Sequence, residues 1–270
     1  MLLHLSRCCV LFAVCMLAAC TMINPVARDA ATQLAPSGTL RAAINFGNPI
    51  LAGRSNDGEP RGVSVDLARE LGRRLGVPVE LVPYQAAGRV VEGVKSLAWD
   101  VAFVAIDPLR GNEIDYSAAY VVIEGAYLVR RDSPIRSNAE VDRPGVRVAA
   151  ARGSTYDLYL SRELRQAKIV YAATSQAVTD TFLAQNLEVA AGVRQQVQAD
   201  ALRLPGLRLL DGRFMVINQA MGIPKGRPGG LEYLRGFVEE MKAGGFVAQS
   251  LARHRIEGAL VAPPAGAEKR

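Results

Sequence analysis

The sequence predicts an α/β protein made of two open lobes, each a mostly parallel sheet flanked by helices, with a cleft between the lobes. From residue 39 onward, short apolar strand-like runs alternate with amphipathic helical runs, which is the pattern of βαβ units. The alternation restarts after residue 121, so the chain holds two successive βαβαβ sets. The length of 270 residues, about 1.8 times a typical domain, agrees with two lobes.

The elements of the first set follow from local patterns. Leu67, Leu71 and Leu75 recur on one helical face, and Gly76 is a stop signal for that helix. The uninterrupted apolar run at 101–106 suits a central parallel strand, which is buried on both faces. The expected strands of this set are 40–44, 79–82 and 101–106, and its expected helices are 65–75 and 88–97.

The second set begins with a long strand-like stretch at 121–129. In open α/β sheets, ligands bind beyond the carboxyl ends of the strands, so the cleft between two such lobes is the expected site. The further expected strands are 146–150, 168–171 and 188–191, and the expected helices are 155–164, 175–186, 230–243 and 245–255.

The N-terminus carries the features of an export signal. Residues 8–19 form an apolar run that follows Arg7 and is too short to cross a bilayer, which needs about 20 residues. The run ends in Leu-Ala-Ala-Cys, which resembles the lipobox of bacterial lipoproteins. By that resemblance, residues 1–19 are removed, Cys20 is lipidated, and residues 20–36 form a tether. The alternative is an ordinary signal peptide cut near Ala19, with Cys20 incidental.

Composition excludes several kinds of chemistry. All four cysteines lie in the first twenty residues, so the mature chain would keep only Cys20, itself acylated, and a single histidine, His254. Such a chain lacks the ligands of a Cys/His zinc site, a disulfide framework and a thiol nucleophile. The net charge of +6 is spread evenly, with no basic run interleaved with aromatics, so a nucleic-acid partner is not expected. Neither a metal nor a cofactor is expected.

Two candidate anion-binding elements follow strands at corresponding places in the two sets. Arg110 lies just after the strand at 101–106, and its planar guanidinium suits a carboxylate. After the strand at 146–150, the chain turns through Gly153 into a helix start whose free amides and dipole favour an anion. Each feature alone has an ordinary explanation, namely a solvated or paired arginine and a plain N-cap. Their correspondence favours a small anionic ligand.

An ordered set of segments carries a family resemblance. The segments are 37–44, 62–76, 99–100, 110–117, 153–155 and 222–226. Together they resemble the family-3 bacterial extracellular solute-binding proteins, the amino-acid type that feeds ABC importers, over the chain from about Ser37 to Arg255. The resemblance implies the two-lobed type II fold of periplasmic binding proteins. By it, residues 37–122 and 222–260 form lobe 1, residues 123–221 form lobe 2, and residues 261–270 are a flexible tail.

The resemblance also implies roles for individual residues. Arg110 would bind the ligand's α-carboxylate, and the turn at Gly153, Ser154 and Thr155 would complete that binding. The acid that pairs with the ligand's α-ammonium in this family falls here at about Val193. Its loss disfavours an ammonium group, since a buried charge needs a partner.

Further departures surround this pattern. Asp107 replaces the family's usual threonine, and it could supply the missing acid or equally pair with Arg110. The aromatic that stacks on the ligand has no clear counterpart, although Tyr84 lies nearby. The other expected ligand contacts are Asn48, Ala105 and Arg194.

Three function classes stay open. The leading one is a non-catalytic ABC-importer component, lipid-anchored at Cys20 in the periplasm or cell envelope. It would act as a monomer, capturing a small amino or organic acid for a permease. The second is an enzyme resembling cyclohexadienyl dehydratases, with Asp107 or Glu124 as the acid, although the sequence has no Gly-x-Ser-x-Gly elbow, P-loop or metal motif. The third is a sensory or assembly lipoprotein with a degenerate cleft.

Overall fold

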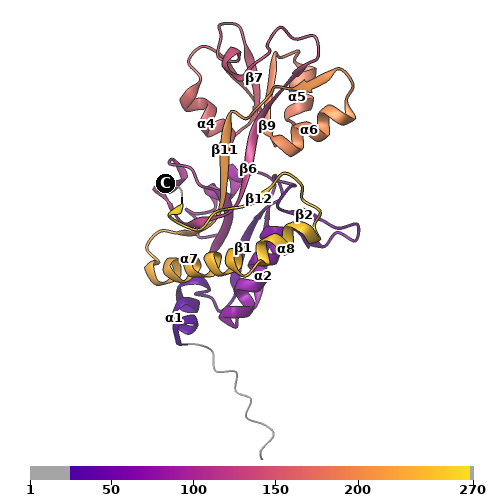
Figure 1. Ribbon diagram of the computed structural model, residues 1–270. Helices are drawn as coiled ribbons and strands as arrows, with labels where there is room; N and C mark the ends of the chain where they lie inside the picture. The colour runs from indigo at the N-terminus through magenta and orange to yellow at the C-terminus, as the bar shows by residue number, and fades with distance from the viewer. Residues whose placement is uncertain (1–24, 268–270) are drawn as a thin grey trace, which may run out of the picture.

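The computed structural model describes residues 25–267 and shows two α/β lobes stacked end to end (Figure 1). The predicted signal peptide and the lipidation site at Cys20 lie outside the described residues. None of the helices in the described part is long and apolar enough to cross a membrane.

Lobe 1 is built on three parallel strands, β4 (Val79–Tyr84), β1 (Leu40–Asn45) and β5 (Val101–Ala105). Every residue of β5 is buried, as its apolar run predicts. Helices α2 (Val63–Leu75), α7 (Pro228–Ala243) and α8 (Phe246–Arg253) contribute to the main core, and α3 (Ala87–Glu92) packs in a smaller cluster around Trp99. α3 is shorter than the predicted helix at 88–97, because the chain leaves it at Gly93 in a series of turns.

Lobe 2 repeats the arrangement with the parallel strands β9 (Val189–Val193), β7 (Arg147–Ala151) and β8 (Lys168–Ala172). Its helices are α4 (Thr155–Glu163), α5 (Val178–Ala184) and α6 (Arg194–Arg203). The remaining short elements of the chain are β2 (Gly53–Arg54), β3 (Pro60–Arg61), η1 (Arg110–Asn112), η2 (Asn138–Glu140) and β10 (Leu207–Leu209).

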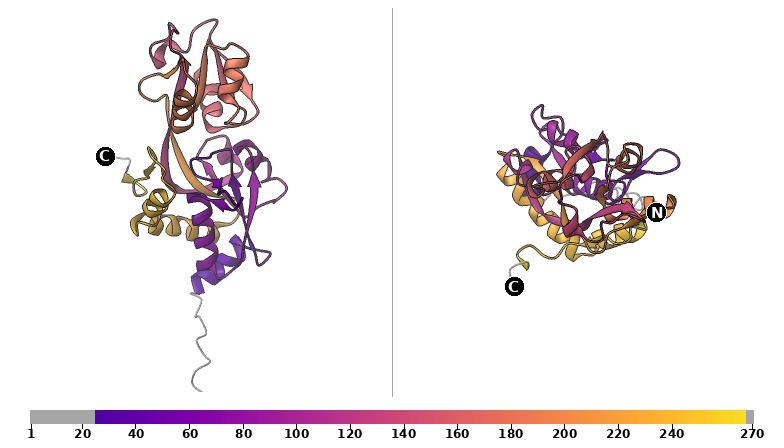
Figure 2. Two further views of the ribbon diagram at one scale, coloured as in Figure 1. Left: turned by 90° about the vertical axis from the view of Figure 1, so that its right-hand side faces the viewer. Right: turned by 90° about the horizontal axis from the view of Figure 1, so that it is seen from above.

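Two long antiparallel strands join the lobes into one sheet. They are β6 (Ile114–Arg130) and β11 (Met215–Pro224), and the strand order is β4-β1-β5-β11-β6-β9-β7-β8. Both strands run from one lobe into the other (Figures 1 and 2). The predicted points of lobe exchange, near 121–124 and 220–224, lie within them. The two lobes are therefore linked through paired strands.

The two ends of the described chain differ from the sequence-based expectations. Residues predicted as part of a tether form helix α1 (Pro25–Leu34), whose Ala30 and Leu34 are buried in the main core. The tether prediction is therefore wrong for these residues. It failed because a helix this short has too few apolar residues for a helical period to be recognised in the sequence. The flexible-tail prediction is wrong at its start, since β12 (Leu260–Val261) pairs with β6 and Ala262 is buried.

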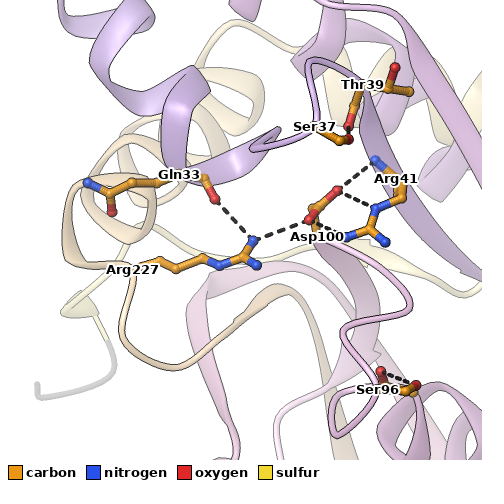
Figure 3. Close-up of polar contacts among 8 residues, drawn as sticks. Gln33, Ser37, Thr39, Arg41, Ser96, Asp100 and Arg227 are labelled. Atoms are coloured by element: carbon orange, nitrogen blue, oxygen red, sulfur yellow. Dashed lines mark hydrogen bonds and ion pairs between the residues drawn. The ribbon is translucent and has the colours of Figure 1, made fainter.

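A buried carboxylate fixes α1 to lobe 1 (Figure 3). Asp100 is fully buried and accepts two hydrogen bonds of 2.9 Å from the guanidinium of Arg41. Arg227 Nη1 lies 3.3 Å from Asp100 Oδ1 and donates to the carbonyl of Gln33, at the end of α1, over 3.0 Å. One carboxylate thus links β1, the start of β5, α1 and the residue before α7.

Candidate functional site

A small cavity lies between the lobes where the carboxyl ends of four parallel strands meet. Asn45, Ala105, Ala151 and Val193, the last residues of β1, β5, β7 and β9, all line it. Its volume is about 40 Å³. That is room for a few water molecules, because one water needs about 10–15 Å³ of space open to a probe of its size. A larger solute enters only when the lobes separate, and hinge motion about paired crossing strands is a common way to do so.

Arg110 spans the cleft from lobe 1 to lobe 2. Its side chain is only 2% exposed, and Nη1 donates to the carbonyl of Ala105 over 3.0 Å. Across the cleft, Nη1 donates to Thr155 Oγ1 over 2.9 Å and Nη2 to the carbonyl of Gly153 over 2.9 Å. Nε has no partner among the described residues. The structure therefore brings the two predicted anion-binding elements into direct contact.

The charge on Arg110 has no directly paired carboxylate in the described part of the chain. Burial lowers the pKa of the Arg110 guanidinium, but an arginine side chain keeps its charge at neutral pH. Its partners are two carbonyl oxygens and one hydroxyl. A cation held only by neutral acceptors in a buried layer makes the interior of the cleft favourable for an anion.

The turn into α4 is built around Gly153. Its φ of +71° favours glycine, and a Cβ at this position would lie 3.0 Å from the Cα of Gly88 in the other lobe. Ser154 caps the helix by accepting from the N–H of Asp157 over 3.0 Å. The ordinary N-cap interpretation therefore holds for Ser154, while Thr155 also reaches Arg110. Both hydroxyl residues line the cavity.

Asp107 lies in the closed cleft but not on the cavity. Its side chain is 1% exposed, and Oδ2 forms an ion pair of 2.9 Å with Nη1 of Arg162 on α4. Oδ1 accepts from the N–H of Leu109 over 2.9 Å. The suggested pairing with Arg110 is wrong, and a role as ammonium partner has no support, because Arg162 engages this carboxylate across the cleft.

Two other expected ligand contacts are also displaced. Tyr84 packs under the turn after α3, so closely that a Cβ on Gly93 would lie 2.7 Å from its hydroxyl. Arg194 forms an ion pair with Glu124 on β6, with Nε 2.7 Å from Oε2, and also donates to the carbonyl of Gly212. Neither lines the cavity, whereas Asn48 and Ala105 do. The roles of Tyr84 and Arg194 as ligand contacts stay predictions.

Within residues 25–267, the lining of the cavity contains no aspartate or glutamate, and its one charged side chain is Arg152. That guanidinium stacks over the ring of Tyr171, 3.9 Å from its centroid. Four carboxamides also line the cavity, and sequence reasoning identified only one of them, Asn48; the others are Asn45, Gln196 and Gln219. These three carboxamides are hard to identify from the sequence, because their position on the cavity depends on which strand face and which helix turn point inward.

The part of the chain that the structure describes contains no group of three or more His, Cys, Asp or Glu side chains that could hold a metal ion. The polar groups on the cavity are hydroxyls, carboxamides and one guanidinium. These groups can form hydrogen bonds with a ligand and can bind an anion.

Two α/β lobes joined by paired strands, with a cavity between them, form the architecture of the periplasmic binding proteins. The chain belongs to the bacterial extracellular solute-binding proteins, family 3, whose model matches residues 40–255. A comparison with curated proteins gave no match.

Several solved structures share the fold. A mutant of ArgBP from T. maritima matches with a TM-score of 0.71 and 21% identity, over 83% of this chain and 98% of that one. The solute receptor for L-cysteine of Neisseria gonorrhoeae matches with a TM-score of 0.72 and 21% identity, over 84% and 92%. An ancestral amino acid-binding protein, a precursor of cyclohexadienyl dehydratase, has a TM-score of 0.68 and 23% identity, over 81% and 96%. These likenesses confirm the predicted two-lobed fold.

Proposed function

We propose that this protein is the substrate-binding component of an ABC importer and captures a small carboxylate-bearing solute between its lobes. The observation that carries the proposal is the bridge from Arg110 to Gly153 and Thr155. These groups come from different lobes and meet in the cleft, where the buried cation forms no ion pair with a carboxylate of the described residues. A solute carboxylate would supply the missing negative charge.

Binding would follow from an exchange of acceptors. When the lobes part, Arg110 loses Thr155 Oγ1 and the Gly153 carbonyl as acceptors. A carboxylate takes their place on the guanidinium fork, and the N-terminus of α4 with the hydroxyl of Thr155 faces it from the other lobe. Closure then removes the pair from water, which strengthens the interaction.

The test is a calorimetric and thermal-shift screen of the protein against small amino, hydroxy and oxo acids. At least one acid is expected to bind and to raise the unfolding temperature, because a ligand of the folded state stabilises it by mass action. Arg110→Ala should weaken that binding at least about 30-fold, since truncating one partner of a buried charge pair is strongly unfavourable.

The matched control is Arg89→Ala, an exposed arginine on α3 that pairs with Glu92 at the surface. It should leave the affinity unchanged. Arg110→Lys keeps the charge but loses the planar fork of the guanidinium. Its affinity for the acid should lie between those of the native protein and Arg110→Ala. Equal affinities of the native protein and Arg110→Ala for the bound acid would refute the carboxylate assignment.

We also propose a binding role rather than an enzymatic one. The two acids considered for catalysis are both engaged: Asp107 pairs with Arg162, and Glu124 pairs with Arg194 and Arg213. These arginines lower the pKa of Glu124, which makes it a poor proton donor at neutral pH. Purified protein is expected not to turn over prephenate or arogenate. Measurable turnover of either compound would contradict the binding-only role.

The membrane attachment is proposed from the sequence of the export signal. Lipidation at Cys20 would hold the chain at the cell envelope, with the two lobes free to meet a permease. The protein should partition into the detergent phase of a Triton X-114 extract. Cys20→Ser should move it to the aqueous phase, whereas Cys9→Ser should not. Aqueous partition of the native protein would contradict the anchor.

A further inference from the structure

Gln219 is a buried carboxamide whose side chain makes no hydrogen bond within the described part of the chain. It lies on β11, is 7% exposed and lines the cavity. Side chains alternate along a strand, and here Ile217 and Gln219 face the cavity while Asn218 lines a separate hollow. Among the described residues, its amide atoms do not belong to the fully buried side-chain atoms that lack a partner, so they keep access to the space of the cavity. Because they make no hydrogen bond within the described residues, they are free to bind a group of the ligand.

The backbone around Gln219 is shaped to aim this side chain. β11 pairs with β6 in one register up to Gln219, opposite Val121, and in a shifted register from Ala220, opposite Ala119. An irregularity of this kind bends a strand and re-aims a side chain, and it is common beside binding sites. On its other edge, Gln219 pairs with Ala105, the residue whose carbonyl accepts from Arg110. Gln219 is thus tied directly to the proposed carboxylate site.

The surrounding charges are unfavourable for an ammonium group. Among the described residues the lining has no acidic side chain, and Val193, the N-cap residue of α6, and Gln196, in its first turn, lie beside the cavity. The N-termini of α4 and α6 both reach the cavity, and the partial charge of a helix N-terminus is positive. With Arg152 on the lining and Arg110 buried nearby, an ammonium would meet two cations there, while the nearby carboxylates of Asp107 and Asp157 are engaged by Arg162 and by the N–H of Gly153 and do not line the cavity. A hydroxyl or carbonyl group meets no such penalty.

Carboxamides suit a neutral oxygen, because each one can both donate and accept a hydrogen bond. Asn45 uses its Oδ1 to accept from the N–H of Gly47, over 3.0 Å. Asn48 Oδ1 is buried and has no partner among the described residues. Together with Gln219 and Gln196, these side chains provide several amide donors and acceptors in one small space.

We propose that the solute is a small hydroxy or oxo acid rather than an amino acid, and that Gln219 binds its hydroxyl or carbonyl oxygen. The inference rests on the proposed function, since Arg110 is taken to hold the carboxylate. Gln219 then favours acids that carry a hydroxyl or carbonyl group at the position where an amino acid carries its ammonium.

The test compares matched acids that differ only in this group: L-lactate, pyruvate and L-alanine, then the corresponding hydroxy, oxo and amino acids of the valine and leucine skeletons. In calorimetry, the best hydroxy or oxo acid should bind at least about tenfold tighter than its amino counterpart, the size of a hydrogen-bonding or charge mismatch in a buried site. Tighter binding of the amino acid would overturn this inference and leave the proposed function standing. No binding across the panel would contradict both.

Two substitutions separate a ligand role of Gln219 from a structural one. Gln219→Leu should weaken binding of the hydroxy or oxo acid at least about tenfold, yet leave the unliganded protein about as stable, because the Gln219 side chain makes no hydrogen bond within the described residues that the substitution would remove. Gln219→Glu should reduce or reverse the preference for the hydroxy or oxo acid over the amino acid, since the glutamate carboxylate can pair with an ammonium. The matched control is Asn218→Leu, on the same strand but away from the cavity, which should preserve the affinity. Unchanged affinities in both Gln219 variants would refute its role.

Discussion

Arg110 shows how much a single residue can be predicted from sequence. Its position after a buried strand indicates a cleft-facing guanidinium, and the turn at Gly153 and Thr155 is predicted independently in the other lobe. The structure joins all three through hydrogen bonds of 2.9 Å. Asp107 was harder to assign, because its partner Arg162 lies 55 residues further along the chain. A pattern of local spacing carries no information about such a pair.

Gln219 was missed for a related reason. Whether residue 217, 218 or 219 faces the cleft depends on strand register, and here the register shifts between Gln219 and Ala220. A one-residue change in register moves a side chain to the opposite face. The same applies to Asn45 and Gln196, which reach the cavity only through the ends of β1 and α6.

Glu70 gives a pH-dependent prediction at the scale of one residue. Hydrogen bonds from Arg73 and Arg74, of 2.7 and 2.8 Å, lower the pKa of its carboxyl group from 4.5 to about 2. A carboxylate with a lowered pKa stabilises the fold above its unfolded-state pKa and loses that contribution as the pH falls. The free energy of unfolding should therefore decrease between about pH 4.5 and pH 2.

The check is chemical denaturation of the native protein and Glu70→Gln across this range. The variant should show a shallower decrease, because it has no carboxylate to protonate at this position. Above about pH 5 the two slopes should coincide, since the unfolded-state carboxyl is then mostly ionised. If the free energies of unfolding of the two proteins decreased in parallel throughout the acid range, the lowered pKa of Glu70 would be refuted.

At the scale of elements, the lobes are held together by contacts from β5 and its following loop to α4. The ion pair of Asp107 with Arg162 lies beside the Arg110 bridge, and Gln176 adds a hydrogen bond of 3.0 Å to the carbonyl of Phe46. These contacts stabilise the closed arrangement. The elements themselves could be predicted, because apolar runs and helical periods are local. The α1 helix could not, since Ala30 and Leu34 are buried only because other helices cover them.

Arg162→Ala should weaken ligand binding at least about tenfold. The variant leaves the carboxylate of Asp107 buried and unpaired in the closed form, whereas opening hydrates it, so the closed form is disfavoured. Calorimetry with the best-binding acid measures the effect. Adding Asp107→Asn to the variant should restore part of the affinity, because the unpaired charge is removed.

The control for this prediction is Arg143→Ala, which removes a surface pair of 3.7 Å to Glu140 within lobe 2. Its affinity should match that of the native protein. Native affinity in Arg162→Ala would mean that the ion pair does not favour closure.

At the scale of the whole molecule, the two crossing strands explain how one chain can both enclose a solute and release it. β6 and β11 pair with each other and carry the sheet from one lobe to the other, while the cavity lies at the carboxyl ends of the flanking parallel strands. A rotation about these strands changes the contacts across the cleft and leaves each lobe's core intact. The general position of the site follows from this topology, and its chemistry follows from Arg110 and the carboxamides.

The central claim is that a small carboxylate binds between the lobes at Arg110, and a crystal structure with the tightest-binding acid of the panel tests it most directly. The account predicts the acid in the cleft, with its carboxylate on the guanidinium of Arg110 and facing the start of α4. An acid bound elsewhere, or bound in the cleft with its carboxylate away from Arg110, would contradict the account.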